Sequence, residues 1–552
     1  MIRPRTHTER AIFDLWSDLR PEDAFGQGID ACAGRFNVPT SAAETRFLRR
    51  IDRLTRMAED ETQERILASW RMRLELREPC EAPTAVMDAF FAHAMKGALR
   101  PRHVASLANA GRRALHLAAR RARAKVSPPG MRALVQLACD GLRVMLRSVG
   151  KTSQPGDAQQ ALANLRGSTD RYAARFDLPG FAPGANFAET FAVLRKNGSR
   201  LGRSKRYARA LRDLWDYRET PSQVESAGLR MIRAELGSFQ RVVEDLARDL
   251  GCDATGEAVE NLLRSTRGLP PGRVLPFLQA LRGRALPVAE KHLVRINPAY
   301  AMEILETPEY LVNTTPAGAA YSLDTFTDHP KDIFLVTTDS SAGRQTPAEL
   351  LSLLVHEEYG HCVHGSNAGT GYAARPGVLD LLNGPSVCVS EGLAFQMESD
   401  FLPILGGIAA RSMTGDEERA FADFFDAVGG VETVAREYEF HTLLGRITRF
   451  LRVVGDARIN SGKQDLVDFL EWAHRRTGLA RATVYYAVFP AHQALGPGYA
   501  TTYAIIGESI RRIQGEALRR GKSLPDFNAY ATSIGWPPRS VFEKRLDAWA
   551  RA

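Results

Sequence analysis

The sequence has few cysteines and no close cysteine pairs. Its six cysteines are spread from Cys32 to Cys388 in a chain of 552 residues, and none belongs to a C-x-x-C motif. Thiols scattered in this way do not outline a disulfide framework. They are typical of reduced cysteines, so we expect a cytoplasmic protein.

The sequence also lacks an apolar segment suited to a membrane. Its first residues, MIRPRTHTERAIFDLW, carry charge but neither an apolar core nor a small-residue cleavage site, so we expect no signal peptide. One uncharged stretch of 26 residues, 482–507, contains Pro490, Pro497, His492 and several glycines, which argue against a membrane span. We therefore expect no membrane partner.

Positive charge is in excess, but it follows no nucleic-acid pattern. The formal net charge is +9, and much of the excess lies in text such as residues 112–125, RRALHLAARRARAK. There the arginines alternate with Ala, Leu and His at helical spacing, as on the solvated face of a helix. Because no aromatic residues are interleaved and no known motif is present, we expect no nucleic-acid partner.

The composition and the length indicate a globular protein of more than one lobe. Hydrophobic residues make up 44% and charged residues 25% of the chain, which is ordinary for such a protein, and 552 residues exceed one simple core. From Thr8 to about Cys252 the apolar residues recur at helical spacing, with breaks at proline and glycine. We expect a mostly α fold, with an N-terminal helical lobe over 1–265 and a catalytic helical lobe over 266–552.

A small β element is expected just before the helix that begins after Thr346. Residues 332–338, DIFLVTT, are rich in β-branched and aromatic residues. A helix should begin just after them, because Thr346, Pro347 and Glu349 provide a cap, a first-turn proline and an acid. An extended peptide could pair with the edge of such a strand, although a buried strand without a substrate role fits equally well.

That helix carries the candidate catalytic residues. Residues 350–365 read LLSLLVHEEYGHCVHG, an apolar run that leads into His356, Glu357, His361 and His364. Two imidazoles can bind zinc, and a glutamate beside the first can take a proton from metal-activated water. The pattern predicts a zinc hydrolase with His356 and His361 as ligands and Glu357 as general base. Ordinary helix histidines beside a coincidental glutamate are the alternative.

The spacing of the two histidines is unusual. They are five residues apart, one more than in the H-E-x-x-H motif. In an ideal α-helix this turns the side chains about 140° apart, too far to share one ion. A one-residue π-bulge would bring His356 and His361 together, and Gly360 is the residue best able to accept the altered backbone. His364, three residues after His361, would give ligand-like geometry only in a different pairing, so it is a candidate for a supporting position beside the ligands.

A third ligand is expected in residues 385–400, PSVCVSEGLAFQMESD. Glu391 and Glu398 are seven residues apart, which is two helical turns, so both face the same way. Acids on an apolar helix face need a partner such as a metal or a histidine N–H. We predict that Glu391 is the third zinc ligand and that Glu398 holds a ligand histidine from behind. A structural ion pair is the alternative.

Further candidates for substrate contacts lie downstream. Arg449 and Arg452 share a predicted helix and could clamp a substrate carboxylate, or they could form structural ion pairs. A Gly-Pro-Gly turn precedes Tyr499 and Tyr503, which are four apart and so lie on one side of a helix. A phenol hydroxyl there could stabilise the oxyanion of amide hydrolysis, although tyrosines also pack in cores. His492, just upstream, is a further substrate-binding candidate.

Four motifs in this order resemble those of gluzincin metallopeptidases: HEEYGHCVH, EGLAFQME from Glu391, RFLR from Arg449 with Asp456, and PGYATTY from Pro497. The nearest pattern is that of a widespread bacterial family of uncharacterised, mostly helical proteins, which carries HE-x-Y-PGHH, EGWALYAE, R-x-x-R-x-x-x-D and PGQATAYKIG. The thimet oligopeptidase family is more distantly similar, through its two glutamates seven apart and its G-Y-x-x-x-Y segment. The longer H-E-x-x-G-H form resembles dipeptidyl peptidase III.

The resemblance implies zinc ligands at His356, His361 and Glu391 and a general base at Glu357. It also implies a deep channel between two helical lobes, suited to short unstructured peptides. The sequence departs from the family pattern where Leu393 replaces a tryptophan and where the proline of PGHH is missing. Asn460 and Tyr499 likewise replace a histidine and a glutamine.

The expected function is zinc-dependent hydrolysis of amide bonds in short peptides, with Zn²⁺ as cofactor. Glu357 would pass a proton from water to the leaving amine, and Tyr499 or Tyr503 would donate to the oxyanion. One alternative is a hydrolase of a non-peptide amide in small-molecule metabolism. The other is a pseudoenzyme whose metal site has become a binding cleft. The expected partner is a short peptide or a small amide, and no oligomeric state follows from the sequence.

Overall fold

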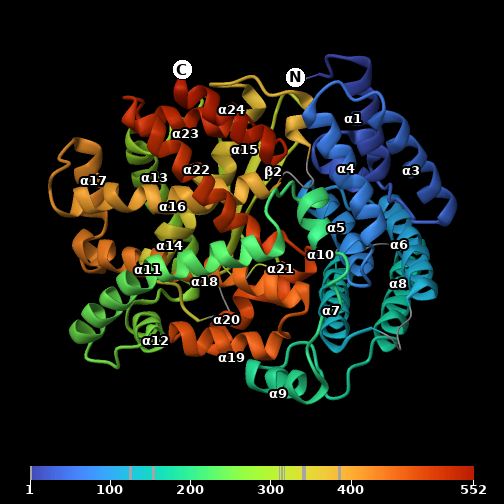
Figure 1. Cartoon of the computed structure of the whole chain (residues 1–552), viewed down its shortest axis with the longest axis horizontal. Helices are drawn as coiled ribbons and strands as arrows, with labels where there is room; N and C mark the ends of the chain where they lie inside the picture. The colour runs from blue at the N-terminus through green and yellow to red at the C-terminus, as the bar shows by residue number, and fades with distance from the viewer. Residues whose placement is uncertain are drawn as a thin grey trace.

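The computed structural model describes residues 3–122, 127–151, 156–309, 311–312, 315, 317–338, 343–382 and 387–552. Helices dominate these residues, as the sequence predicts, and a single small sheet accompanies them (Figure 1). The first residues of the predicted segment 385–400 lie outside the described residues. Among the described residues, no helix combines the length and the apolar character needed to cross a membrane.

The N-terminal half is built of helices joined by short connections. Its longer helices are α1 (His7–Leu19), α2 (Pro21–Gly26), α3 (Ser41–Thr55), α4 (Glu61–Leu76), α5 (Glu81–Met95), α6 (Pro101–Arg121), α7 (Pro129–Lys151), α8 (Asp157–Ala174), α9 (Phe187–Asn197), α11 (Pro221–Leu250), α12 (Gly256–Arg267) and α13 (Pro271–His292). Between α9 and α11 the chain forms the short helices α10 (Tyr207–Arg209) and η3 (Ala210–Leu214). In Figure 1 the bluest of these helices gather on one side of the molecule.

The C-terminal half carries the candidate residues. Its helices include α14 (Pro347–Leu354), η4 (Val355–Cys362), α15 (Val363–Thr370), α16 (Val387–Ala409), α17 (Asp416–Phe424), α18 (Val431–Ser461), α19 (Leu466–Thr477), α20 (Arg481–Val488), α21 (Pro490–Ala494), η7 (Tyr499–Thr501), α22 (Thr502–Arg519), α23 (Leu524–Ser533) and α24 (Arg539–Arg551). Because α16 packs on both η4 and α22, the predicted ligand segments lie side by side.

The sheet confirms the predicted strand but changes its role. The strands β1 (Met302–Glu306), β2 (Gly318–Leu323) and β3 (Lys331–Val336) lie in the order β1-β3-β2. The predicted strand is β3, which pairs in parallel with β1 and antiparallel with β2. Both of its edges are therefore occupied, and the idea that it offers an edge to a peptide is wrong. Among the described residues β1 and β2 each pair only with β3, so each of these two strands has an open edge.

One hydrophobic core joins the two halves of the chain. The helices α11 and α18 pack along each other, and their buried apolar residues belong to one continuous cluster. A capping box of Thr220 and Gln223 begins α11, with Pro221 in the first turn. A smaller cluster groups the first helices with Phe326 and Trp536 from the C-terminal half. The division of the chain at 265/266 stays a prediction.

Candidate metal centre

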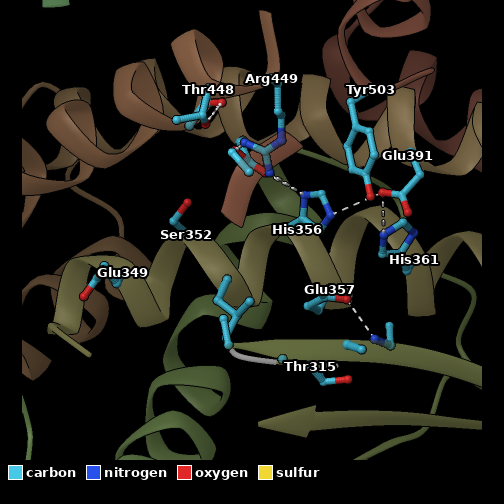
Figure 2. Close-up of a pocket in the computed structure, with 18 of the residues that line it drawn as sticks. Thr315, Glu349, Ser352, His356, Glu357, His361, Glu391, Thr448, Arg449 and Tyr503 are labelled. Atoms are coloured by element: carbon cyan, nitrogen blue, oxygen red, sulfur yellow. Dashed lines mark hydrogen bonds and ion pairs between the residues drawn. The ribbon is translucent and has the colours of Figure 1, made fainter. Parts of the chain in front are cut away.

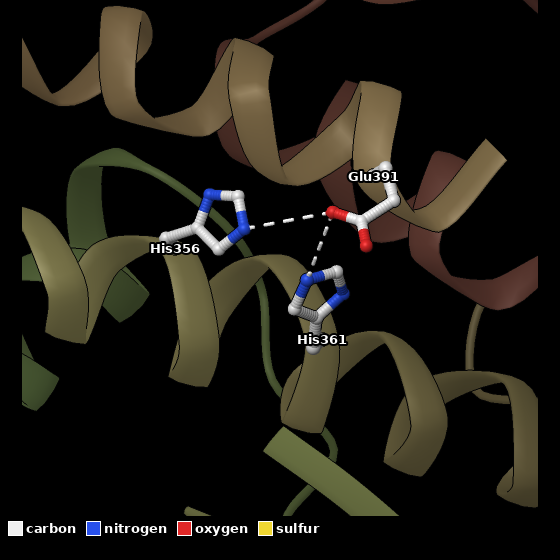
Figure 3. A group of neighbouring side chains, drawn as sticks. All are labelled: His356, His361 and Glu391. Carbon is white, nitrogen blue, oxygen red and sulfur yellow. Dashed lines mark ion pairs between the residues drawn. The ribbon is translucent and has the colours of Figure 1, made fainter. Parts of the chain in front are cut away.

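The predicted π-bulge is present where the histidine spacing requires it. Thr346 and Glu349 form a capping box that begins α14, and the helix then passes without a break into the π-helical segment η4. In a π-helix the hydrogen bonds join residues five apart, so side chains at i and i+5 lie one above the other. His356 and His361 therefore point to the same side, and their rings lie 4.9 Å apart between centroids (Figure 3).

Gly360 serves this arrangement for a different reason than the sequence suggests. Its backbone does not adopt the positive φ that favours glycine. Instead a Cβ atom at this position would overlap the Cβ and the Cα of Ala394 on α16. Glycine is thus required because η4 and α16 approach closely, and this approach carries Glu391 to the histidines.

His356, His361 and Glu391 form a compact group of candidate ligands (Figure 3). Oε2 of Glu391 lies 3.7 Å from Nε2 of His356 and 3.6 Å from Nε2 of His361. Ligands bound at 2.0–2.1 Å to a tetrahedral zinc ion lie about 3.4 Å from each other, close to these separations. The distances are also too long for good hydrogen bonds. The three side chains are thus spaced as ligands around a common ion would be.

The unsatisfied atoms of the group fit a cation. Oε2 of Glu391 is buried and accepts no hydrogen bond, although burying an unpaired carboxylate oxygen is costly. Each histidine has its other nitrogen engaged: Nδ1 of His356 lies 2.5 Å from Glu398, and Nδ1 of His361 lies 2.8 Å from Oγ of Ser390. These contacts hold the rings with Nε2 toward Glu391. Two imidazoles and one carboxylate are a donor set of catalytic zinc sites.

Burial and neighbouring charges have opposite effects on the pKa values of His356 and Glu391. Burial disfavours the charged form of His356, but Glu391 and Glu398 raise the pKa of its imidazole to about 10. Burial also disfavours the carboxylate of Glu391, but His356 and His361 hold its pKa well below the usual range. The centre therefore favours a positive charge among these side chains, which a proton or a metal ion can supply.

Arg449 lines the cleft, but its guanidinium is paired with Glu398 behind His356. Its Nη1 donates to Oε2 of Glu398 across 3.0 Å, and its Nη2 donates to Oε1 across 2.6 Å (Figure 2 shows Arg449 beside His356). Of the two readings that the sequence left open, the structure therefore shows the ion pair. The predicted contact of Glu398 with His356 is present.

Glu357 faces the cleft beside the edge of the sheet. Its Oε2 accepts a hydrogen bond of 2.8 Å from the backbone N–H of Ala320 on β2 (Figure 2). This contact fixes the carboxylate next to the candidate ligands. Sequence reasoning missed β2, because its residues, GAAYSL, lack the alternation that marks a strand.

The two tyrosines lie at the centre and differ in their contacts. The hydroxyl of Tyr499 donates to Oε1 of Glu391 across 2.8 Å. The hydroxyl of Tyr503 lies 3.3 Å from that of Tyr499. Because the only hydroxyl proton of Tyr499 is given to Glu391, Tyr503 is the donor in the second contact. Tyr499 thus orients the third ligand, and the proton of Tyr503 is the one free to turn toward a substrate.

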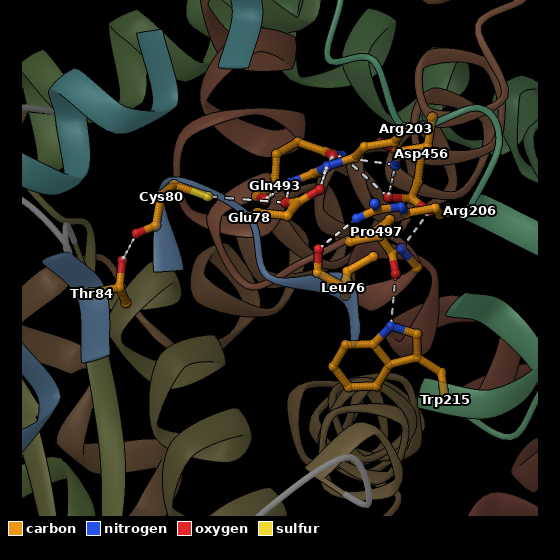
Figure 4. A network of polar contacts seen from close by, with 12 residues as sticks. Leu76, Glu78, Cys80, Thr84, Arg203, Arg206, Trp215, Asp456, Gln493 and Pro497 are labelled. Carbon is orange, nitrogen blue, oxygen red and sulfur yellow. Dashed lines mark hydrogen bonds and ion pairs between the residues drawn. The ribbon is translucent and has the colours of Figure 1, made fainter. Parts of the chain in front are cut away.

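A buried polar network holds the turn that leads to Tyr499 (Figure 4). Asp456 is fully buried and accepts hydrogen bonds from the N–H of Gly498 at 3.0 Å and from the hydroxyl of Tyr207 at 2.8 Å. Trp215 donates to the carbonyl of Pro497 at 2.8 Å. Tyr207 and Trp215 come from the N-terminal half, and no local sequence signal marks them. They show that this half helps to position the candidate site.

The remaining candidates are divided between the cleft and the interior. Arg452 lines the cleft, donates from Nε to the carbonyl of Ala487 at 2.9 Å and lies over the ring of Tyr503. His492 also lines the cleft, and its Nδ1 is buried without a hydrogen bond. His364 points elsewhere: its Nε2 lies 2.9 Å from the carbonyl of Gly535. The predicted supporting role of His364 therefore finds no contact here.

These side chains surround a cavity of about 920 Å³. Its lining includes the three candidate ligands, Glu357 and the open edge of β2. A cavity of this size is in the range of small-molecule and short-peptide sites.

No family model and no curated protein matches this chain. Several solved structures do match, and two of them share nearly the whole length of the chain. One is described as "putative lipoprotein from Colwellia psychrerythraea"; it has a TM-score of 0.64 and 13% identity, and the match covers 99% of each chain. The other is described as a "putative lipoprotein of unknown function from Shewanella oneidensis"; it has a TM-score of 0.62 and 15% identity, and the match covers 98% of each chain. The likeness is one of fold, and fold alone does not assign a reaction.

Proposed function

We propose that this protein is a zinc-dependent hydrolase that cleaves amide bonds in short peptides, related to the gluzincin metallopeptidases. The observation that carries the proposal is the group of His356, His361 and Glu391 beside the carboxylate of Glu357 in one cavity. Glu391 keeps a buried oxygen without a hydrogen-bond donor, aimed between two imidazole nitrogens. Such a trio is suited to hold Zn²⁺.

When bound, Zn²⁺ supplies Lewis-acid activation to water and to the carbonyl of the scissile amide. Glu357 accepts the proton of the attacking water and delivers it to the amide nitrogen as the C–N bond breaks. Because Ala320 donates to Oε2 of Glu357, the other oxygen is left for this proton. The products are a carboxylate and an amine, so the proton taken from water leaves on the amine.

Tyr503 supports the negative charge that develops on the carbonyl oxygen. Its proton is not committed to a carboxylate, and turning the hydroxyl would break only the 3.3 Å contact with Tyr499. A donor that is already in place when the charge develops lowers the barrier of acyl transfer. Tyr499 instead keeps the carboxylate of Glu391 oriented.

The open edge of β2 is suited to an extended peptide. In an antiparallel strand the N–H and the C=O of one residue point to the same side. Since the N–H of Ala320 points to Glu357, its carbonyl also faces the cleft and can pair with a peptide N–H. Arg452 has no carboxylate partner among the described residues and could take a substrate carboxylate.

The test is cleavage of a mixed library of short peptides, read by mass spectrometry, with zinc bound per chain measured in parallel. Wild type should cut, and Glu357→Gln should bind zinc equally but lose several orders of magnitude in rate. Cuts by both proteins would remove Glu357 from the mechanism. No cuts by a wild type that holds one zinc per chain would reject the peptide substrate and favour a small non-peptide amide.

A further inference from the structure

The arginines that line the cleft differ in what neutralises them. Arg264 pairs with Glu260 at 2.9 Å and with Glu349 at 2.7 Å. Arg449 donates two hydrogen bonds to a carboxylate. Within the described part of the chain, Arg452 has no carboxylate at ion-pair distance, although it is half-buried and lines the same cavity. A cation that is partly withdrawn from water and has no acid beside it is costly, and it is the feature expected where an anion binds.

The guanidinium of Arg452 is fixed in place with one edge free. Its Nε donates to the carbonyl of Ala487 at 2.9 Å, and its Cζ lies 4.9 Å from the ring centre of Tyr503. Neither Nη1 nor Nη2 donates a hydrogen bond to a described residue, and neither is a fully buried atom. Both nitrogens are therefore open to the cavity. A guanidinium held in this way can bind both oxygens of one carboxylate.

His492 offers a further donor beside the same tyrosine. Its ring lies 5.6 Å from the ring of Tyr503, between centroids, and lines the cavity. Nδ1 is buried without a hydrogen bond, whereas Nε2 is not fully buried and so is open to the cavity. Because an N–H is costly to bury without an acceptor, the proton of the neutral imidazole belongs on Nε2. Burial and the charge of Arg452 hold the pKa of His492 well below its usual range, so the ring is neutral and keeps this donor.

The two donors lie next to the candidate metal centre. Both contact the ring of Tyr503, whose hydroxyl lies 3.3 Å from that of Tyr499, and Tyr499 donates to Glu391 (Figure 2 shows Tyr503 beside Glu391). An extended peptide advances about 3.3 Å per residue, so a carboxylate bound by Arg452 lies about one to three residues from a carbonyl beside the hydroxyl of Tyr503.

The charges around the two half-buried arginines of the cleft act in opposite directions. Burial disfavours the charged form of both Arg264 and Arg452. For Arg264, the carboxylates of Glu349 and Glu260 outweigh burial and raise the pKa. For Arg452, burial outweighs the neighbouring groups and lowers the pKa to about 10. The negative charge that Arg264 receives from the protein is therefore missing at Arg452, and a bound carboxylate would supply it.

We propose that Arg452 and His492 bind the C-terminal carboxylate of the peptide, so that the protein cleaves about one to three residues from the carboxyl end. This inference rests on the proposed function and adds to it the end of the substrate that is recognised. An acidic side chain within the peptide could supply the same carboxylate chemistry, and the experiment distinguishes the two sources.

The test measures binding by calorimetry on the full-length Glu357→Gln protein, both loaded with zinc and treated with a chelator. The probes are tetra-alanine, its C-terminal amide and an amidated Ala-Ala-Glu-Ala peptide. The free acid should bind about 10- to 100-fold tighter than its amide, which is the range of a charge-assisted contact. The preference should persist without zinc, because a carboxylate that bound the metal instead would lose its advantage there.

Variants assign the preference to Arg452. Arg452→Gln should remove most of it, and Arg452→Lys should restore a part, because an ammonium keeps the charge but lacks the planar fork. His492→Phe should lower the preference by about 2- to 10-fold, the effect of one neutral hydrogen bond. Arg512→Gln removes an exposed arginine from α22 and should leave the preference unchanged. Thermal transitions should confirm that each variant folds.

Cleavage by wild type gives an independent readout. In alanine peptides of increasing length the cut should stay at a constant distance from the carboxyl end, and amidation should raise KM more than it lowers kcat. A preference for the free acid without any cuts would support the carboxylate site and reject the proposed hydrolysis. Equal cleavage of free and amidated peptides would keep the hydrolase and overturn this inference.

Two further results would overturn the C-terminal assignment. One is tight binding of the amidated glutamate peptide with no preference for the free acid of tetra-alanine, which would assign the carboxylate to a side chain. The other is a full preference for the free acid in Arg452→Gln, which would place the carboxylate elsewhere in the cleft.

Discussion

Oε1 of Glu398 lies 2.5 Å from Nδ1 of His356, and Arg449 holds the same carboxylate with two hydrogen bonds. The buried carboxylate of Glu398 thus supports the candidate ligand His356, and the guanidinium of Arg449 holds that carboxylate in place. Partners of this kind set the orientation of a ligand imidazole and raise its basicity.

Glu398→Gln should therefore weaken zinc binding. The amide keeps the shape of the side chain, but it removes the charge that faces His356 and leaves Arg449 without its ion pair. We expect an affinity loss of about 10- to 100-fold, measured by competition with a chromogenic chelator. Glu432→Gln, an exposed acid on α18, is the matched control. An unchanged affinity in Glu398→Gln would show that the acid does not support the metal.

Removing the hydroxyl of Tyr499 and removing that of Tyr503 should have different effects on zinc affinity and on turnover. Tyr499→Phe removes the donor to Glu391 and should weaken both zinc binding and turnover. Tyr503→Phe should leave zinc affinity unchanged and lower kcat by about 10²-fold, since it removes an oxyanion donor. Zinc titration and steady-state kinetics on both variants check this, and the reverse pattern would exchange the two roles.

Gly360→Ala should disturb the metal centre through packing. The added methyl group would overlap Ala394, so η4 and α16 must move apart. Overpacking of this kind costs about 1–3 kcal/mol, and the shift should also lower zinc affinity. Denaturant unfolding and zinc titration provide the measurements. Gly237→Ala, on α11 with open space around it, should instead be neutral or stabilising.

Asp88→Asn should change the pH dependence of stability. Burial raises the pKa of Asp88 from 3.8 to about 6, so the folded state binds more protons than the unfolded state between these values. The stability of wild type therefore falls as pH rises through this window. The asparagine variant does not lose this stability, because its side chain does not titrate. We expect the variant to match wild type near pH 4 and to exceed it by about 1–2 kcal/mol at pH 8, allowing for solvent screening of this half-buried side chain.

Denaturant unfolding at several pH values measures this difference. A stability difference that stays constant from pH 4 to pH 8 would mean that Asp88 does not titrate in this range.

The sequence predicted the features of the site that depend on spacing along one helix. The separation of five positions from His356 to His361 excludes a regular α-helix if both face one ion, and η4 is the resulting π-helix. The seven-residue spacing of Glu391 and Glu398 likewise predicted that both would face the histidines. The candidate His364 is suggested only by its closeness in sequence to His361, and its side chain instead turns toward the carbonyl of Gly535, a residue far along the chain.

Features that depend on distant segments could not be predicted. The strand β2 has small residues and no alternation, so its place beside Glu357 follows from tertiary pairing with β3. Asp88 and Arg73 sit on different helices, where a charged residue is ordinarily read as solvent-exposed. Only the packing of α4 against its neighbours makes both side chains line one cavity of about 520 Å³.

The network around Asp456 has a consequence for the way the protein is made. Arg203 pairs with Glu78, and it also donates to Oε1 of Gln493 at 2.6 Å. Glu78 and Arg203 leave the ribosome long before Asp456 and Gln493, which they need for a closed, fully bonded interior. Contacts between such distant segments slow folding, because the intervening chain must be ordered first. A nascent chain can therefore present both histidines before Tyr499 exists to orient Glu391, so the complete centre forms only near the end of synthesis.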